Sequence, residues 1–153
     1  GIAYSRDEAK ITLVKVPDRP GVAASIFGPL ADANINVDMI VQNVSDDGTS
    51  TDLTFTVARD DLDRAKAVLE ERQDKLAYAQ LVPDSNVAKI SVIGVGMRSR
   101  VGVAQQMFCT LAENGINIQV ISTSEIKVSV LIEEKFTEQA LRSLHTAYDL
   151  DAP

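Results

Sequence analysis

Residues 9–41 read AKITLVKVPDRPGVAASIFGPLADANINVDMIV, and residues 88–123 read AKISVIGVGMRSRVGVAQQMFCTLAENGINIQVIST. Both stretches begin with Ala-Lys-Ile, and after an insertion of two residues Gly21-Val22-Ala23 returns as Gly102-Val103-Ala104. A repeating unit of about eighty residues is too long for a solenoid and is the size of a small domain. The chain therefore contains two copies of one fold, and its function is expected to depend on both.

The first copy alternates between strand-like and helix-like patterns. Its β-rich segments are bounded by turn residues, and its apolar residues fall at helical spacing between them. We expect strands at 11–16, 37–44, 52–58 and 79–82, and helices at 21–33 and 62–76. Asn34 is expected to end the first helix in a left-handed conformation. The order β-α-β-β-α-β is that of the ferredoxin-like unit, an antiparallel four-stranded sheet with two helices on one face.

The second copy repeats this order but runs out of chain before a fourth strand. We expect its strands at 90–95, 118–122 and 127–133, and its helices at 102–113 and 137–150. Because an open sheet edge is a liability, we expect residues 2–4 to supply the missing strand. The predicted fold is therefore α+β, with a first domain at 9–83 inserted into a second domain made of 1–8 and 84–153.

Composition excludes several classes of function. The net charge is −7 and aromatic residues make up 5% of the chain, which argues against binding nucleic acid or an anionic membrane. A single cysteine, Cys109, rules out a disulfide framework and a zinc site of several thiolates. No apolar run approaches the ~20 residues of a membrane helix. These features suggest a cytoplasmic setting. The polar start GIAYSRDEAK resembles no signal peptide, and its lack of an initiator Met suggests a piece of a longer protein.

The turn PDRPG before the first helix is the strongest candidate for a binding site. The backbone amides of Gly21, Val22 and Ala23 lie at the positive end of a helix dipole, which suits a carboxylate. Asp18 and Asp38 add negative charges that suit an ammonium group. Together they predict a pocket for a free amino acid. The alternative, which spacing alone favours, is a tight turn with an N-capping Asp.

Other polar positions are less specific. Asn36 and Asn117 precede the second strand of each copy and can equally be turn residues. Ser99 replaces Asp18 in the second copy, so the two copies are expected to differ in ligand or in affinity. We expect no catalytic site, since His145 is expected on the surface, Cys109 in the core, and no metal cluster or phosphate loop is present in the sequence.

Three strings give the chain a family resemblance: VPDRPG at 16–21, INVDMIVQN at 35–43 and ISTSEI at 121–126. They resemble the regulatory region of aspartate kinase, which consists of two tandem ACT domains. The resemblance implies an amino-acid sensor for feedback inhibition of the aspartate pathway, responding to threonine, lysine or both together. It implies a homodimer, in which ACT domains pair side by side into eight-stranded sheets with effectors at the seam. The kinase site, with its ATP and Mg, would belong to a separate catalytic domain or subunit, so no cofactor is expected in this chain.

The resemblance also implies an effector pocket. Carried over by position, it consists of Asp18, Arg19, Pro20, Gly21, Val22, Ala23, Asn36, Val37, Asp38, Gln42, Val103, Ala104, Asn117, Ile118, Ser124 and Glu125. Two alternatives stay open. One is a small ferredoxin-like enzyme such as an acyl-phosphate hydrolase, for which Arg19 beside Gly21 is the only hint. The other is a stand-alone sensor with two ACT domains serving another pathway, against which the specific strings QNVS and ISTSEI argue.

Overall fold

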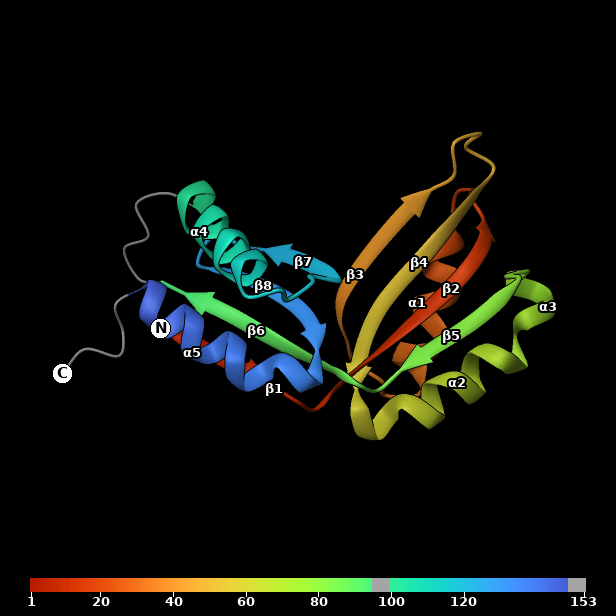
Figure 1. Ribbon diagram of the computed structural model, residues 1–153. Coiled ribbons are helices and arrows are strands. Elements are labelled where there is room, and N and C mark those ends of the chain that lie inside the picture. Colours follow the sequence, from red (N-terminus) through yellow and green to blue (C-terminus); the bar gives the residue numbers. More distant parts are fainter. Residues whose placement is uncertain (95–99, 149–153) are drawn as a thin grey trace. The chain divides into compact units, whose positions relative to one another are not determined.

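A computed structural model describes residues 1–94 and 100–148 (Figure 1). The chain divides into two compact units, which we call the inserted unit, Asp7–Ser85, and the split unit, made of Gly1–Arg6 and Asn86–Pro153. Each has its own four-stranded sheet and its own helices, so the fold is α+β. Each end of the inserted unit lies two residues outside the expected range of 9–83, since its first strand begins at Glu8 and its last strand ends at Asp84, both beyond the expected strands.

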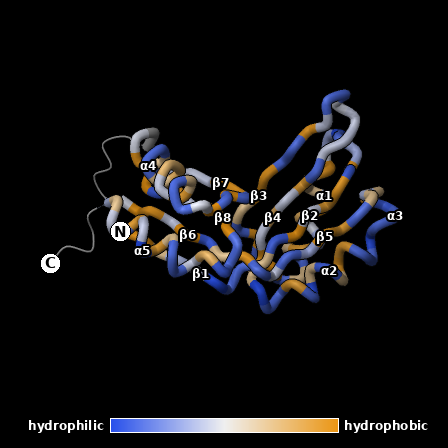
Figure 2. The backbone as a smooth tube through the Cα atoms, viewed as in Figure 1, coloured by the Kyte–Doolittle hydropathy of each residue, from blue (hydrophilic) through white to orange (hydrophobic). Residues whose placement is uncertain are grey.

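The inserted unit contains a fully antiparallel sheet with the strand order β3-β4-β2-β5. Its strands are β2 (Glu8–Pro17), β3 (Val37–Val44), β4 (Ser50–Ala58) and β5 (Gln80–Asp84). Its helices are α1 (Val22–Asp32), η1 (Arg59–Asp61), α2 (Leu62–Glu71) and α3 (Gln73–Leu76). Alternate residues of β2 and β4, such as Ile11 and Phe55, are fully buried against Ile26 and Leu30 of α1. The tip of the β3–β4 hairpin is hydrophilic (Figure 2).

The split unit repeats this architecture in the order β1-β6-β8-β7, again antiparallel throughout. Its strands are β1 (Ile2–Ser5), β6 (Val87–Ile93), β7 (Val120–Thr123) and β8 (Lys127–Glu133). Its helices are α4 (Arg100–Glu113), η2 (Glu134–Phe136) and α5 (Thr137–Ala147). β1 takes the place that β5 has in the inserted unit, and pairs with β6 from Ile2 opposite Val92 to Ser5 opposite Lys89.

The same device ends the first helix of each unit. Asn34 and Gly115 both adopt left-handed conformations, with φ of 60° and 70°. The amide of the next residue, Ile35 or Ile116, donates 2.9 Å back to the carbonyl of Leu30 or Leu111. These are Schellman motifs, and in each the pair of apolar residues is buried, as the motif favours. The expectation for Asn34 is confirmed.

Two expectations about the helices are wrong. The helix expected over 62–76 is interrupted at Arg72, where φ is −110° and ψ is 14°. Cys109 is exposed, because Met107 and Leu111, four residues apart, carry the buried stripe of α4 and Cys109 points away from it. His145, expected on the surface, is partly exposed on α5. The segment expected after residue 148 lies outside the described residues.

Candidate amino-acid binding site

The turn before α1 is built around Gly21. This residue is the N-cap of α1, with φ of 87° and ψ of −4°, a left-handed conformation that glycine adopts without a steric cost. No side chain caps the helix, so the alternative of an N-capping Asp is wrong. Asp18, Arg19, Pro20 and Ala23 are exposed, as is Gly21, whereas Val22 is 8% exposed and belongs to the core.

Not all the amides of this turn are available to a ligand. The amide of Val22 donates to the carbonyl of Arg19 at 3.2 Å, so the expectation that it is an unpaired donor is wrong. The amide of Asp18 donates to the carbonyl of Thr49 at 3.1 Å and ties the turn to the β3–β4 hairpin. In a helix beginning at Val22, the amides of Ala23 and Ala24 have no carbonyl within the helix to meet. These two amides, at the positive end of the dipole, are the groups that can receive a carboxylate.

The remaining predicted residues of the inserted unit lie on β3. Asn36, Asp38 and Gln42 are exposed and Val37 is half-buried. Asp38 sits in a bulge between Val37 and Ile40, where the amide of Met39 donates to the buried hydroxyl of Thr56 at 3.0 Å. Gln42 lies opposite Leu53, near the hairpin end of the strand.

The inserted unit divides its candidate residues between two ends. The turn and Gln42 lie at the hairpin end, since Asp18 bonds Thr49 and Val44 pairs with Thr51. Asn36, Val37 and Asp38 follow α1, and the 11 residues of that helix span about 16 Å. Asp18 and Asp38 therefore do not lie side by side within one unit, and the expected pairing of a carboxylate-binding and an ammonium-binding group is not formed there.

The split unit separates its candidates in the same way. Val103 and Ala104 are half-buried near the start of α4, at the same end as the exposed Ser124 and Glu125. The amide of Ser124 closes the β7–β8 turn by donating to the carbonyl of Lys127 at 2.8 Å. Asn117, exposed, and Ile118, half-buried, follow the far end of this 14-residue helix.

The start of α4 differs from that of α1. We expected this helix to begin at Gly102, but it begins at Arg100, so Gly102 lies inside the helix whereas Gly21 lies before one. The expected difference at Ser99 lies outside the described residues. The two copies therefore differ in where the first helix begins relative to the corresponding glycine.

Sequence reasoning missed a polar hollow beside the first turn. It has a volume of about 250 Å³ and is lined by Lys15, Asn43, Val44, Ser45, Ser50, Thr51 and Asp52. Lys15 has a φ of 55°, at a bulge between β2 and β4, and its amide donates to the carboxylate of Asp52 at 2.9 Å. The only signal in the sequence is that Lys15 aligns with Gly94 of the second copy.

The described residues contain neither a metal-binding cluster nor a helix that could span a membrane. No three His, Cys, Asp or Glu side chains within 1–94 and 100–148 gather into a possible metal site. Nor does any helix in that part of the chain have the length and apolar character needed to cross a membrane.

Comparison with known proteins defines the class of both units. Models of the ACT domain match residues 10–75 and 90–148, one in each unit. Each sheet with its covering helices is thus an ACT domain.

The relatives make the assignment specific. The chain is 54% identical to a chain in a crystal structure of aspartokinase alpha and beta subunits, with 97% of each chain covered and a TM-score of 0.91. It is 38% identical to the regulatory subunit of aspartate kinase from Thermus thermophilus, again over 97% of each chain, with a TM-score of 0.90. It is also 59% identical, over its whole length, to an aspartate kinase of Pseudomonas fluorescens (strain SBW25), of which it spans 37%. The chain belongs to the family of aspartate kinase regulatory subunits and C-terminal regulatory regions.

Proposed function

We propose that the chain senses amino acids for an aspartate kinase, binding threonine, alone or together with lysine, between ACT domains of two copies. The kinase activity, with its ATP and Mg, would reside in a catalytic domain or subunit that this chain regulates in the cytoplasm. The observation that carries the proposal is the separation of the candidate residues to opposite ends of each unit. Among the residues that the structure describes, neither unit brings its candidate residues together into one pocket, so a second unit would have to supply the other half.

Antiparallel pairing of two units along their edge strands brings the two halves together. In such a pairing, the end of one unit that carries the turn lies beside the end of the partner unit at which the partner's edge strand begins. The turn with Gln42 would then face Asn117 and Ile118 of the other copy, and Val103, Ala104, Ser124 and Glu125 would face Asn36, Val37 and Asp38. The helix N-terminus would hold the effector's carboxylate, and the polar side chains its ammonium group.

The edge strands suit such pairing. β3 and β7 occupy the same position in the two units and each is an edge strand. Ile40 and Ile121, which correspond in the repeat, are 53% and 47% exposed, and an exposed edge with apolar side chains is a template for another strand. Pairing across two copies would close both edges and cover both side chains.

Charge favours pairing of an inserted unit with a split unit. The inserted unit holds 15 of the 22 acidic residues and 8 of the 15 basic residues, so its formal charge is −7. The split unit holds seven of each sign and is formally neutral. Two inserted units side by side would repel each other, whereas a mixed pair would not. A homodimer with two mixed seams follows from this argument.

Regulation would follow from thermodynamic linkage between effector binding and the arrangement of the dimer. An effector that bridges two copies binds one arrangement of the dimer more tightly than another, and shifts the population by at most that difference in affinity. Membership in this family favours a sensor over the acyl-phosphate hydrolase hypothesis, and aspartate kinase over an unrelated pathway.

Calorimetric titration with L-threonine, with and without L-lysine, tests the proposal, together with the mass of the chain in solution. We expect saturable binding, a dimer that tightens with effector, and weaker binding by Asp18→Ala with an unchanged fold. Asp74→Ala, a change of the same kind on exposed α3, is the matched control and should bind like the parent. Absence of binding to a folded dimer would refute the sensor proposal, and unchanged affinity of Asp18→Ala would refute the assignment of the pocket.

A further inference from the structure

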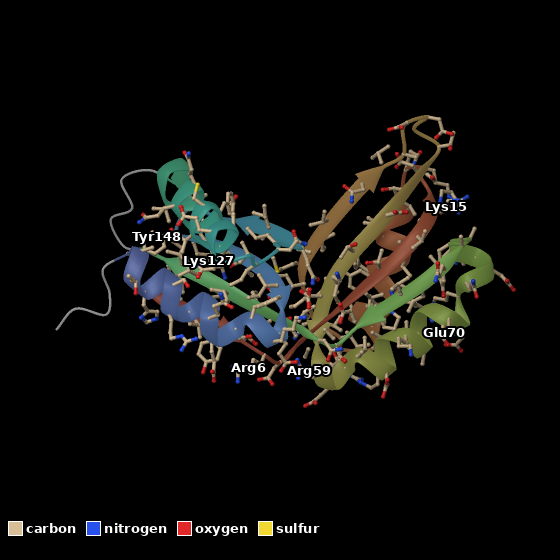
Figure 3. All side chains as sticks on the ribbon, viewed as in Figure 1. Arg6, Lys15, Arg59, Glu70, Lys127 and Tyr148 are labelled. Carbon is tan, nitrogen blue, oxygen red and sulfur yellow. The ribbon has the colours of Figure 1, made fainter. Side chains whose placement is uncertain are left out.

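Two hydrogen bonds join the end of α5 to the beginning of α4. The hydroxyl of Tyr148 donates to the carbonyl of Val103 at 2.5 Å, and the side-chain amide of Gln106 donates to the carbonyl of Ala147 at 2.6 Å. Each helix end thus supplies one donor and one acceptor. Tyr148, labelled in Figure 3, also packs with Val103 against the core of the split unit. We call this pair of bonds the staple.

The two bonds of the staple can hold α4 and α5 in a fixed position relative to each other. Burial raises the pKa of the Tyr148 phenol, so the hydroxyl keeps the proton that it donates at every physiological pH. The bonds bridge residues 45 and 41 positions apart in the chain, so they fix one helix against the other rather than stiffening either alone.

The inserted unit uses the corresponding positions differently. Ser25 aligns with Gln106, and its hydroxyl donates to the carbonyl of Gly21 in its own helix turn at 3.0 Å. Arg72 aligns with Ala147 when the buried residues of α2 and α5 are superimposed, and its guanidinium donates to the carbonyl of Val68 at 3.2 Å. At these positions of the repeat, the inserted unit therefore makes bonds within a helix where the split unit makes bonds between helices.

We infer that Tyr148 and Gln106 are positioning residues, which hold the first turn of α4 in the geometry that binds an effector without touching the effector themselves. The inference rests on the proposed function, in which Val103 and Ala104 at this turn contact the ligand. When the turn is already ordered in the free chain, binding does not incur the entropic cost of ordering it. The staple thus holds the beginning of α4 in place, and loosening it weakens the site built on that helix start alone.

Replacing a single hydroxyl tests this role. Tyr148→Phe keeps the packed ring and removes the bond to Val103. Tyr78→Phe is the matched control, because Tyr78 also donates to a backbone carbonyl, that of Leu69 at 3.1 Å, but in the inserted unit. We expect Tyr148→Phe to weaken threonine at one class of site about 3- to 10-fold, the effect of one lost hydrogen bond. The other class should be unchanged, and Tyr78→Phe should leave both unchanged. Gln106→Leu should reproduce the effect of Tyr148→Phe.

Hydrogen exchange provides a readout that needs no effector. In the full-length chain without ligand, amides in the first two turns of α4 should exchange faster in Tyr148→Phe than in the parent or in Tyr78→Phe. Faster exchange with unchanged threonine affinity would overturn the inference, since the staple would then be structural only. Unchanged exchange would overturn it as well. If the parent binds no threonine while exchange responds as expected, the failure lies with the proposed function and with the binding role of the staple, and its hold on α4 stands.

Discussion

Substituting alanine at two glycines that correspond in the repeat should change stability in opposite directions. Gly21 has a φ of 87°, and an L-residue in that region costs about 1–2 kcal/mol. Loss of backbone freedom in the unfolded chain returns about 0.4–1 kcal/mol, so Gly21→Ala should destabilise by about 1 kcal/mol. No heavy atom lies within 4 Å of the added Cβ, so the effect is conformational and not a clash. Gly102 lies within α4, where alanine is favoured over glycine by about 1 kcal/mol.

Urea unfolding of the two variants and the parent measures this difference. We expect the midpoint to fall for Gly21→Ala and to rise for Gly102→Ala, with unchanged slopes, because neither change alters the surface exposed on unfolding. A thermal scan should show shifts of about 2–4 °C in the two directions. Shifts of the same sign would refute the reasoning, because they would mean that Gly21 and Gly102 have the same backbone conformation.

Three further predictions concern backbone strain and pH. Lys15→Gly should raise the thermal midpoint by relieving a left-handed residue worth about 1–2 kcal/mol, whereas Lys15→Ala should not. Hydrogen bonds, chiefly from the Ser45 hydroxyl, lower the pKa of Asp47 from 3.8 to about 2. The ionised carboxylate therefore stabilises the fold above pH 3.8, and this stabilisation is lost as the pH falls towards 2. The corresponding loss of stability should be absent when Asp47→Asn is unfolded at decreasing pH. Burial raises the pKa of Tyr148 and of Tyr78 above 10. The stability that each protonated phenol contributes is complete below pH 10 and is lost as the pH rises further. The stability of either Phe variant should therefore fall less steeply with pH in the alkaline range than that of the parent.

Much of the fold could be predicted because the same sequence pattern occurs twice in the chain. Apolar spacing around Ile26 and Leu30 located the first helix, and Asn34 located its end. The missing fourth strand of the second copy pointed to residues 2–4, which pair with β6. The start of α4 could not be predicted from the alignment, because a glycine is compatible both with a left-handed N-cap and with a helix interior. Gly102 takes the second of these conformations.

The site was harder to predict than the fold. Alignment identified residues of the right chemistry but gave no distances between them. In a β-α-β unit, the turn before the helix and the strand after it lie at opposite ends of that helix, so Asp18 and Asp38 are separated by the length of α1. The bond from the Val22 amide to the Arg19 carbonyl depends on the left-handed Gly21, which no periodicity reveals.

The path of β1 has a consequence for how the chain folds. Its partner β6 begins at Val87, so their pairing closes a loop of about eighty residues if the intervening chain is unfolded. The inserted unit draws its own ends together, with Lys10 opposite Asp84, and reduces that loop to a few flexible residues. By the logarithmic dependence of closure entropy on length, this lowers the entropic cost of seating β1 by about 2 kcal/mol. The inserted unit therefore acts as a folding template for its host: it should form first during synthesis, and mutations that slow its folding should delay completion of the other sheet.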